Sequence, residues 1–137
     1  MKISPLMISA VLGLAAMTAP AFADDPNQPP ARCFSMHDFE NWKAPDAKTI
    51  YIRVGVNRYY RLDLSTPCQA LTWPDSHLIT KVRGGDQVCT GIDWDLAVSD
   101  SSGGLGRGAG MREACIVKTQ TPLSPADVAQ IPKKFKP

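Results

Sequence analysis

The sequence contains no motif of a common catalytic site and carries little net charge. No serine lies in a G-x-S-x-G nucleophile elbow, no C-x-x-C pair marks a zinc or redox site, and the only histidines are His37 and His77. The balance of 15 basic and 13 acidic residues gives a net charge of +2. The basic residues form no concentrated patch of the kind that nucleic acids require. We therefore expect no nucleic-acid partner, no metal and no cofactor.

Long apolar runs are also absent, apart from one at the N-terminus. This run extends from about Leu6 to Met17, follows the single basic residue Lys2, and is succeeded by Ala21-Phe22-Ala23. A bilayer-spanning helix needs roughly 20 apolar residues, whereas a basic start, a short run and an A-x-A sequence are typical of a signal peptide. We expect residues 1–23 to be cleaved near Ala23, and prefer this to an uncut membrane anchor. The mature protein would then be periplasmic or secreted and would have no stable membrane span.

Four cysteines, Cys33, Cys68, Cys89 and Cys115, lie in the part of the chain that export would place in an oxidising compartment. Two disulfides are their expected use. Four cysteines allow three pairings, and the sequence does not choose among them. We favour Cys33–Cys115 with Cys68–Cys89, because the outer bridge would join the ends of the domain and the inner bridge would hold one crossover.

The clearest structural signal is a β-hairpin between residues 48 and 68. Aliphatic residues alternate with polar ones over residues 50–54, and a second alternating run covers residues 60–64. A period of two predicts strands with one buried face. Gly55 and Asn57 tolerate positive φ and predict a turn of three or four residues between the two strands.

Weaker patterns predict the remaining elements. Further strands are expected at residues 77–83, 92–98 and 114–118. Ser35, followed by Phe39 and Trp42 at helical spacing, predicts a short N-terminal helix over residues 34–42. Ser124-Pro125 predicts one helical turn to about Gln130. Residues 24–32 would be a flexible leader, residues 33–118 the disulfide-bonded domain, and residues 119–137 a C-terminal tail.

Together these elements predict a mainly β fold of about five strands, with the short N-terminal helix, the C-terminal helical turn and two disulfides. Sequential antiparallel strands of this length form a small antiparallel barrel or a bent meander.

The order of these features resembles a known family. The features are the opening Cys33, the hairpin with TIYI and YYRLDL, then Pro67-Cys68, then Val88-Cys89 before an aspartate-bearing strand, and the closing Cys115. They resemble a family of small exported proteins of Gram-negative bacteria whose function is unknown. The resemblance spans about residues 32–118 and implies periplasmic export and a compact disulfide-bonded β domain. It implies no activity, ligand or catalytic residue.

Two sets of residues are candidates for a site. Asp93 and Asp95 lie about 7 Å apart on an expected strand. Two carboxylates at this distance can share a proton or a cation. One hypothesis is therefore a carbohydrate-binding or hydrolytic protein that uses these two aspartates with His77. The polar side of a half-buried strand also explains the two aspartates, and we strongly prefer this interpretation because any alternating strand with acidic outward positions has the same pattern. The second set, Tyr51, Arg53, Tyr59 and Arg61, is expected on the outer face of the hairpin. These residue types stabilise one another across strands, and they are also enriched in binding surfaces.

The leading hypothesis is a non-enzymatic binding or accessory module of the cell envelope, whose partner is an unknown envelope protein or small ligand. A third hypothesis is a protease inhibitor that presents Arg107 in the glycine-rich loop 100–110. That loop lacks the G-K-[ST] ending of a phosphate-binding loop. The sequence does not specify the oligomeric state.

Overall fold

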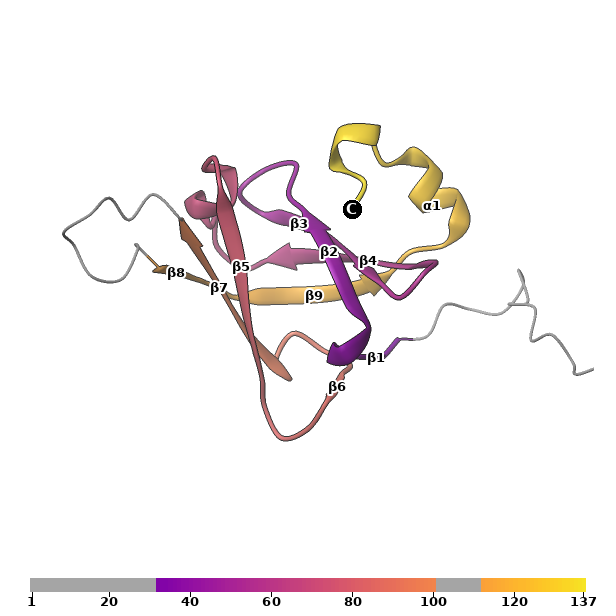
Figure 1. Cartoon of the computed structure of the whole chain (residues 1–137), viewed down its shortest axis with the longest axis horizontal. Helices are drawn as coiled ribbons and strands as arrows, with labels where there is room; N and C mark the ends of the chain where they lie inside the picture. Colours follow the sequence, from indigo (N-terminus) through magenta and orange to yellow (C-terminus); the bar gives the residue numbers. More distant parts are fainter. Residues whose placement is uncertain (1–31, 101–111) are drawn as a thin grey trace, which may run out of the picture.

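The computed structural model describes residues 32–100 and 112–137 (Figure 1). The predicted signal peptide, nearly all of the leader and Arg107 lie outside these residues. Within them, no helix is long and apolar enough to cross a membrane.

The largest sheet has four antiparallel strands in the order β2-β3-β4-β9. These strands are β2 (Phe39–Lys43), β3 (Thr49–Val54), β4 (Arg58–Leu64) and β9 (Val117–Pro122). The predicted hairpin is confirmed: β3 and β4 pair from Thr49–Asp63 to Val54–Arg58. The turn begins at Gly55, whose φ of 59° is accessible to glycine at little cost.

The predicted N-terminal helix is wrong. Ser35 does accept a hydrogen bond from the backbone N–H of His37, but the resulting 3₁₀ turn, η1, spans only Met36–Asp38. The chain then enters β2, which pairs with β3 through a register shift between Phe39 and Asn41. This bulge lets Phe39 and Trp42 both pack against the core although they are three residues apart. Their spacing therefore imitates one face of a helix.

The remaining strands form a three-stranded sheet, β5-β7-β8, and a two-stranded sheet, β1-β6. They are β1 (Phe34–Ser35), β5 (Ser76–Val82), β6 (Gln87–Val88), β7 (Trp94–Asp100) and β8 (Arg112–Cys115). The strand predicted at residues 114–118 is divided between β8 and β9. Ile116, at the break, is 63% exposed.

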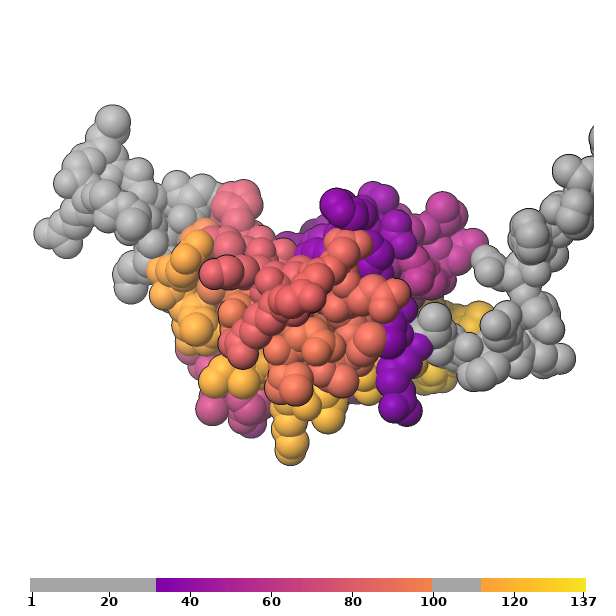
Figure 2. All heavy atoms as spheres, turned by 90° about the horizontal axis from the view of Figure 1, so that it is seen from below, coloured from indigo at the N-terminus to yellow at the C-terminus, as the bar shows by residue number. Residues whose placement is uncertain are grey.

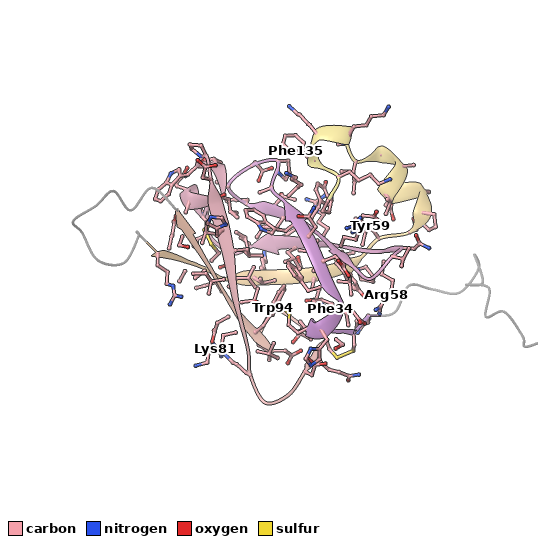
Figure 3. The ribbon with its side chains drawn as sticks, in the orientation of Figure 1. Phe34, Arg58, Tyr59, Lys81, Trp94 and Phe135 are labelled. Atoms are coloured by element: carbon pink, nitrogen blue, oxygen red, sulfur yellow. A yellow bond between two sulfur atoms is a disulfide. The ribbon has the colours of Figure 1, made fainter. Side chains whose placement is uncertain are left out.

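One core joins all three sheets. Phe34 of β1, Tyr60 of β4 and Trp94 of β7 are almost completely buried. Between ring centroids, Phe34 lies 5.0 Å from Tyr60 and 5.7 Å from Trp94. Figure 3 labels Phe34 and Trp94. Such aromatic pairs add to the free energy gained by burial. The core also contains Val88 of β6 and aliphatic side chains from the inner faces of both larger sheets, among them Ile50, Ile52, Val54, Leu62, Leu96 and Val98.

The fold is thus mainly β, as predicted, but the sheets are not closed into a barrel. The C-terminal helical turn is confirmed as α1 (Pro125–Gln130). Ser124 caps it, and its hydroxyl and backbone N–H exchange hydrogen bonds with Asp127. Two further 3₁₀ turns are η2 (Gln69–Thr72) and η3 (Lys133–Phe135).

The cysteines pair as Cys33–Cys89 and Cys68–Cys115, so the favoured pairing was wrong. The pairing of β1 with β6 sets Phe34 opposite Val88 and brings Cys33 next to Cys89. Figure 2 shows the indigo start of the described chain against the orange segment near residue 90. The expectation failed because it placed the two ends of the domain side by side, whereas strand pairing brings each cysteine to a different partner.

A peptide map of unreduced protein should link Cys33 to Cys89 and Cys68 to Cys115. Replacing both Cys68 and Cys115 by serine should lower the free energy of unfolding, measured by urea denaturation, by about 2–5 kcal/mol, because the unfolded chain loses a constraint. A peptide that joins Cys33 to Cys115 would contradict the pairing.

Gly91→Ala tests the close approach between the loop that precedes β7 and strand β9. The added Cβ would lie 2.5 Å from the carbonyl oxygen of Val117 and 2.9 Å from its Cγ1. Because backbone must move to make room, we expect a loss of about 1–3 kcal/mol in the free energy of unfolding. The neighbouring Ile92→Ala is the control: Ile92 is 77% exposed, so its truncation should change stability by no more than about 0.5 kcal/mol. Equal effects of the two variants would refute the contact.

Candidate functional site

The outer face of the four-stranded sheet carries two rows of polar side chains that we call the hairpin face. Strand pairing aligns Lys43, Tyr51, Arg61 and Thr121 in the first row, and Asn41, Arg53 and Tyr59 in the second. Neighbouring strands are about 4.8 Å apart, so each of the two tyrosines has an arginine directly beside it. The four predicted residues, Tyr51, Arg53, Tyr59 and Arg61, are therefore brought together.

The C-terminal segment covers one end of the hairpin face. The backbone N–H of Leu123 donates to the carbonyl oxygen of Tyr59, and Nζ of Lys136 lies 5.7 Å above the Tyr59 ring. Figure 3 shows Tyr59 beneath the segment that carries Phe135. Val128 and Ile131 are buried outside the main core, which indicates that this segment is a packed part of the fold.

The first row remains more open than the second. Arg61 and Lys43 are exposed, whereas Arg53 and Tyr59 are half-buried. Arg61 forms an ion pair with Asp63 at 2.8 Å. The Nε atom of Arg53 is buried and has no hydrogen-bond partner among the described residues. A buried donor without a partner is costly, and its burial places this atom out of reach of a ligand on the surface.

A hollow of about 340 Å³ opens beside β2. It is lined by residues 41–44, by Leu71 of η2, and by Asp75 and Ser76 at the start of β5. Asp75 has a φ of 59°, an uncommon conformation outside glycine. Because Asn41 and Lys43 belong to both features, the hollow is continuous with the hairpin face. Sequence reasoning missed this hollow. The one local signal in the sequence is Pro74-Asp75, a pair typical of a turn.

Asp93 has a structural role in the loop before β7. Its carboxylate accepts hydrogen bonds from the backbone N–H groups of Cys89 and Thr90, at 2.9 and 2.7 Å, and from the Thr90 hydroxyl at 3.1 Å. The two backbone hydrogen bonds favour the charged form and hold the pKa of Asp93 below its usual range. The carboxylate thus stabilises the turn that follows the Cys33–Cys89 bridge.

Asp95 is engaged with a different partner. Its carboxylate accepts hydrogen bonds from the guanidinium of Arg83, which hold its pKa low. On the adjacent strand, Lys81 pairs with Asp95, whereas His77 pairs with Ser99. His77 is thus separated from the Asp95 pair by four residues, about 13 Å along the strand. The arrangement does not bring His77 and the two aspartates into one catalytic group.

His37 lies elsewhere, 3.4 Å from a carboxylate oxygen of Asp86. Within residues 32–100 and 112–137, no cluster of three or more histidine, cysteine, aspartate or glutamate side chains is arranged to hold a metal.

These features define a disulfide-bonded, mainly β domain with a basic and aromatic outer face. Over residues 1–135 the chain matches a family described as "Family of unknown function (DUF6491)", and it belongs to that family. The resemblance stated from the sequence is thereby confirmed at the level of a family without a known function. Comparisons with curated proteins and with solved structures gave no significant match.

Asp93→Asn should lower the free energy of unfolding at neutral pH, because an amide oxygen accepts the two backbone hydrogen bonds less strongly than a carboxylate. The folded-state pKa lies below the ordinary value of 3.8. The contribution of the carboxylate is therefore present above that value and is lost as the pH falls through the folded-state pKa. The difference between wild type and variant, measured by urea denaturation, should shrink below about pH 4. Glu40→Gln, at an exposed carboxylate, is the control. A difference that stays constant from neutral pH to strong acid would contradict this role.

Proposed function

We propose that this protein is an exported, non-enzymatic binding module of the cell envelope that acts in the periplasm or after secretion. The N-terminal pattern with cleavage after Ala23 and the two disulfide bridges support export. The family supplies no activity, so the proposal depends on the surface itself.

The observation that carries the proposal is that strand pairing aligns basic and aromatic side chains in rows on the hairpin face. The register places Tyr51 and Arg61 side by side on the more open row of this face, where Arg61 is exposed and Tyr51 is half-buried. Tyrosine and arginine in alternation also provide large contact area with directed donors, which is typical of binding surfaces.

The two alternative functions have less support. A hydrolase that uses Asp93 and Asp95 would need a third group nearby, and both carboxylates are already bound by structural partners. An inhibitor that presents Arg107 would depend on a loop outside the described residues.

The test uses the mature chain from Asp24 and cell-envelope fractions from the source organism. Mass spectrometry of the exported protein should give a chain that starts at Asp24. The purified protein should be retained by one envelope fraction, and the double variant Tyr51→Ala/Arg61→Ala should lose about 90% of that retention, as expected when central contacts of a binding surface are removed.

The control for retention is Arg83→Ala, which removes an exposed arginine directly after β5, away from the hairpin face. It should bind as the wild type does. Circular dichroism should show that every variant is folded. Equal retention of the double variant and the wild type would refute the proposal, as would a secreted chain that still begins at Met1.

A further inference from the structure

The hollow beside β2 has the size and the chemistry of a small-ligand site. Its volume of about 340 Å³ lies within the usual range of roughly 300–1,000 Å³ for such sites. Trp42, half-buried against the core, is one of the lining residues, and Asn41, Asp75 and Ser76 are lining residues whose side chains carry donors and acceptors. This combination suits a ring with an apolar face and a rim of hydroxyl groups, which is the description of a sugar.

Lys43 connects the hollow to the first row of the hairpin face. From the hollow, the row leads from Lys43 to Tyr51 and then to Arg61. Lys43, the Tyr51 ring and Arg61, whose guanidinium is also paired with Asp63, thus follow one another at steps of about 4.8 Å. A chain of sugar rings that carry negative groups has the complementary alternation, with rings to stack on tyrosine and anions to pair with lysine and arginine.

The surface does not have the character of a hydrophobic protein interface. The large apolar side chains that are strongly exposed in the described chain, Val56, Ile92 and Ile116, lie in three separate connections and not in the hollow or the hairpin face. Single exposed apolar residues are ordinary features of a protein surface.

We infer that the hollow and the first row of the hairpin face together bind a negatively charged oligosaccharide. Trp42 stacks on one sugar ring in the hollow, where Asp75 and Ser76 bind its hydroxyl groups. Lys43 and Arg61 bind acidic groups on either side of Tyr51. This inference rests on the proposed binding function and names the class of ligand.

The experiment is isothermal titration of the full mature protein with three probes of similar length: oligogalacturonate, a neutral gluco-oligosaccharide and linear polyphosphate. Oligogalacturonate should bind, and the other two probes should bind at least about tenfold more weakly. The neutral oligosaccharide has no acidic groups, and polyphosphate has no sugar rings. Binding should quench the fluorescence of half-exposed Trp42, a change that Trp42→Phe removes.

Lys43→Gln should weaken oligogalacturonate binding about tenfold. Its matched control is Lys81→Gln on β5, which lies away from the hollow (Figure 3) and should leave binding unchanged. Trp42 packs against the core, so a loss of binding in Trp42→Ala counts only if a thermal melt shows that the variant is folded. The deciding measurement is the affinity of Lys43→Gln for oligogalacturonate.

Three outcomes would overturn the inference: no binding of oligogalacturonate, equal binding of polyphosphate or of the neutral oligosaccharide, or binding that Lys43→Gln does not weaken. If one of these outcomes occurs while an envelope fraction still retains the wild type and not the Tyr51→Ala/Arg61→Ala variant, the proposed binding function stands and the ligand is of another class. Oligogalacturonate binding that Lys43→Gln weakens, without retention by an envelope fraction, would instead refute only the envelope role.

Discussion

The contact among Phe34, Tyr60 and Trp94 is the constraint on which the rest of the structure depends. Each ring comes from a different sheet, so their packing fixes all three sheets relative to one another. The Cys33–Cys89 bridge lies beside this contact, and the Tyr60 hydroxyl donates to the carbonyl oxygen of Cys33 at 3.4 Å. Burial raises the pKa of Tyr60 above its ordinary value. A two-stranded sheet as short as β1-β6 would be marginal alone. It is stable in this protein because Phe34 and Val88 are buried in the main core.

Local patterns predicted those parts of the fold that local chemistry determines. The alternation in residues 50–54 and 60–64 predicted both the hairpin and the outward direction of Tyr51 and Arg61, because the period of two leaves no other register with a buried aliphatic face. The C-terminal helix was predictable because Ser124 and Asp127 form a capping box within four residues. The N-terminal helix failed for the opposite reason. A bulge placed Phe39 and Trp42 on one side of a strand, and no local signal distinguishes that arrangement from a helical turn.

The disulfide pairing and the hollow depend on contacts between distant segments. Loop entropy scarcely separates the possible pairings, because its dependence on loop length is logarithmic. The choice is made by the β1-β6 pairing, which involves only two residues on each side and has almost no pattern in the sequence. The hollow likewise combines residues 41–44 with Leu71, Asp75 and Ser76. Pro74-Asp75 is a pair typical of a turn, but no feature of the sequence places it beside β2.

The position of the C-terminal segment determines which part of the hairpin face is available. Lys136 lies above Tyr59, and the adjoining Arg53 is half-buried, so the second row is partly occupied by the protein's own chain. The first row, by contrast, begins at edge strand β2, beyond which the hollow extends the surface toward β5. A ligand on this domain would therefore be directed along Lys43, Tyr51 and Arg61. The hairpin supplies the rigid part of that path, because its inner face is anchored in the main core by Ile50, Ile52 and Leu62.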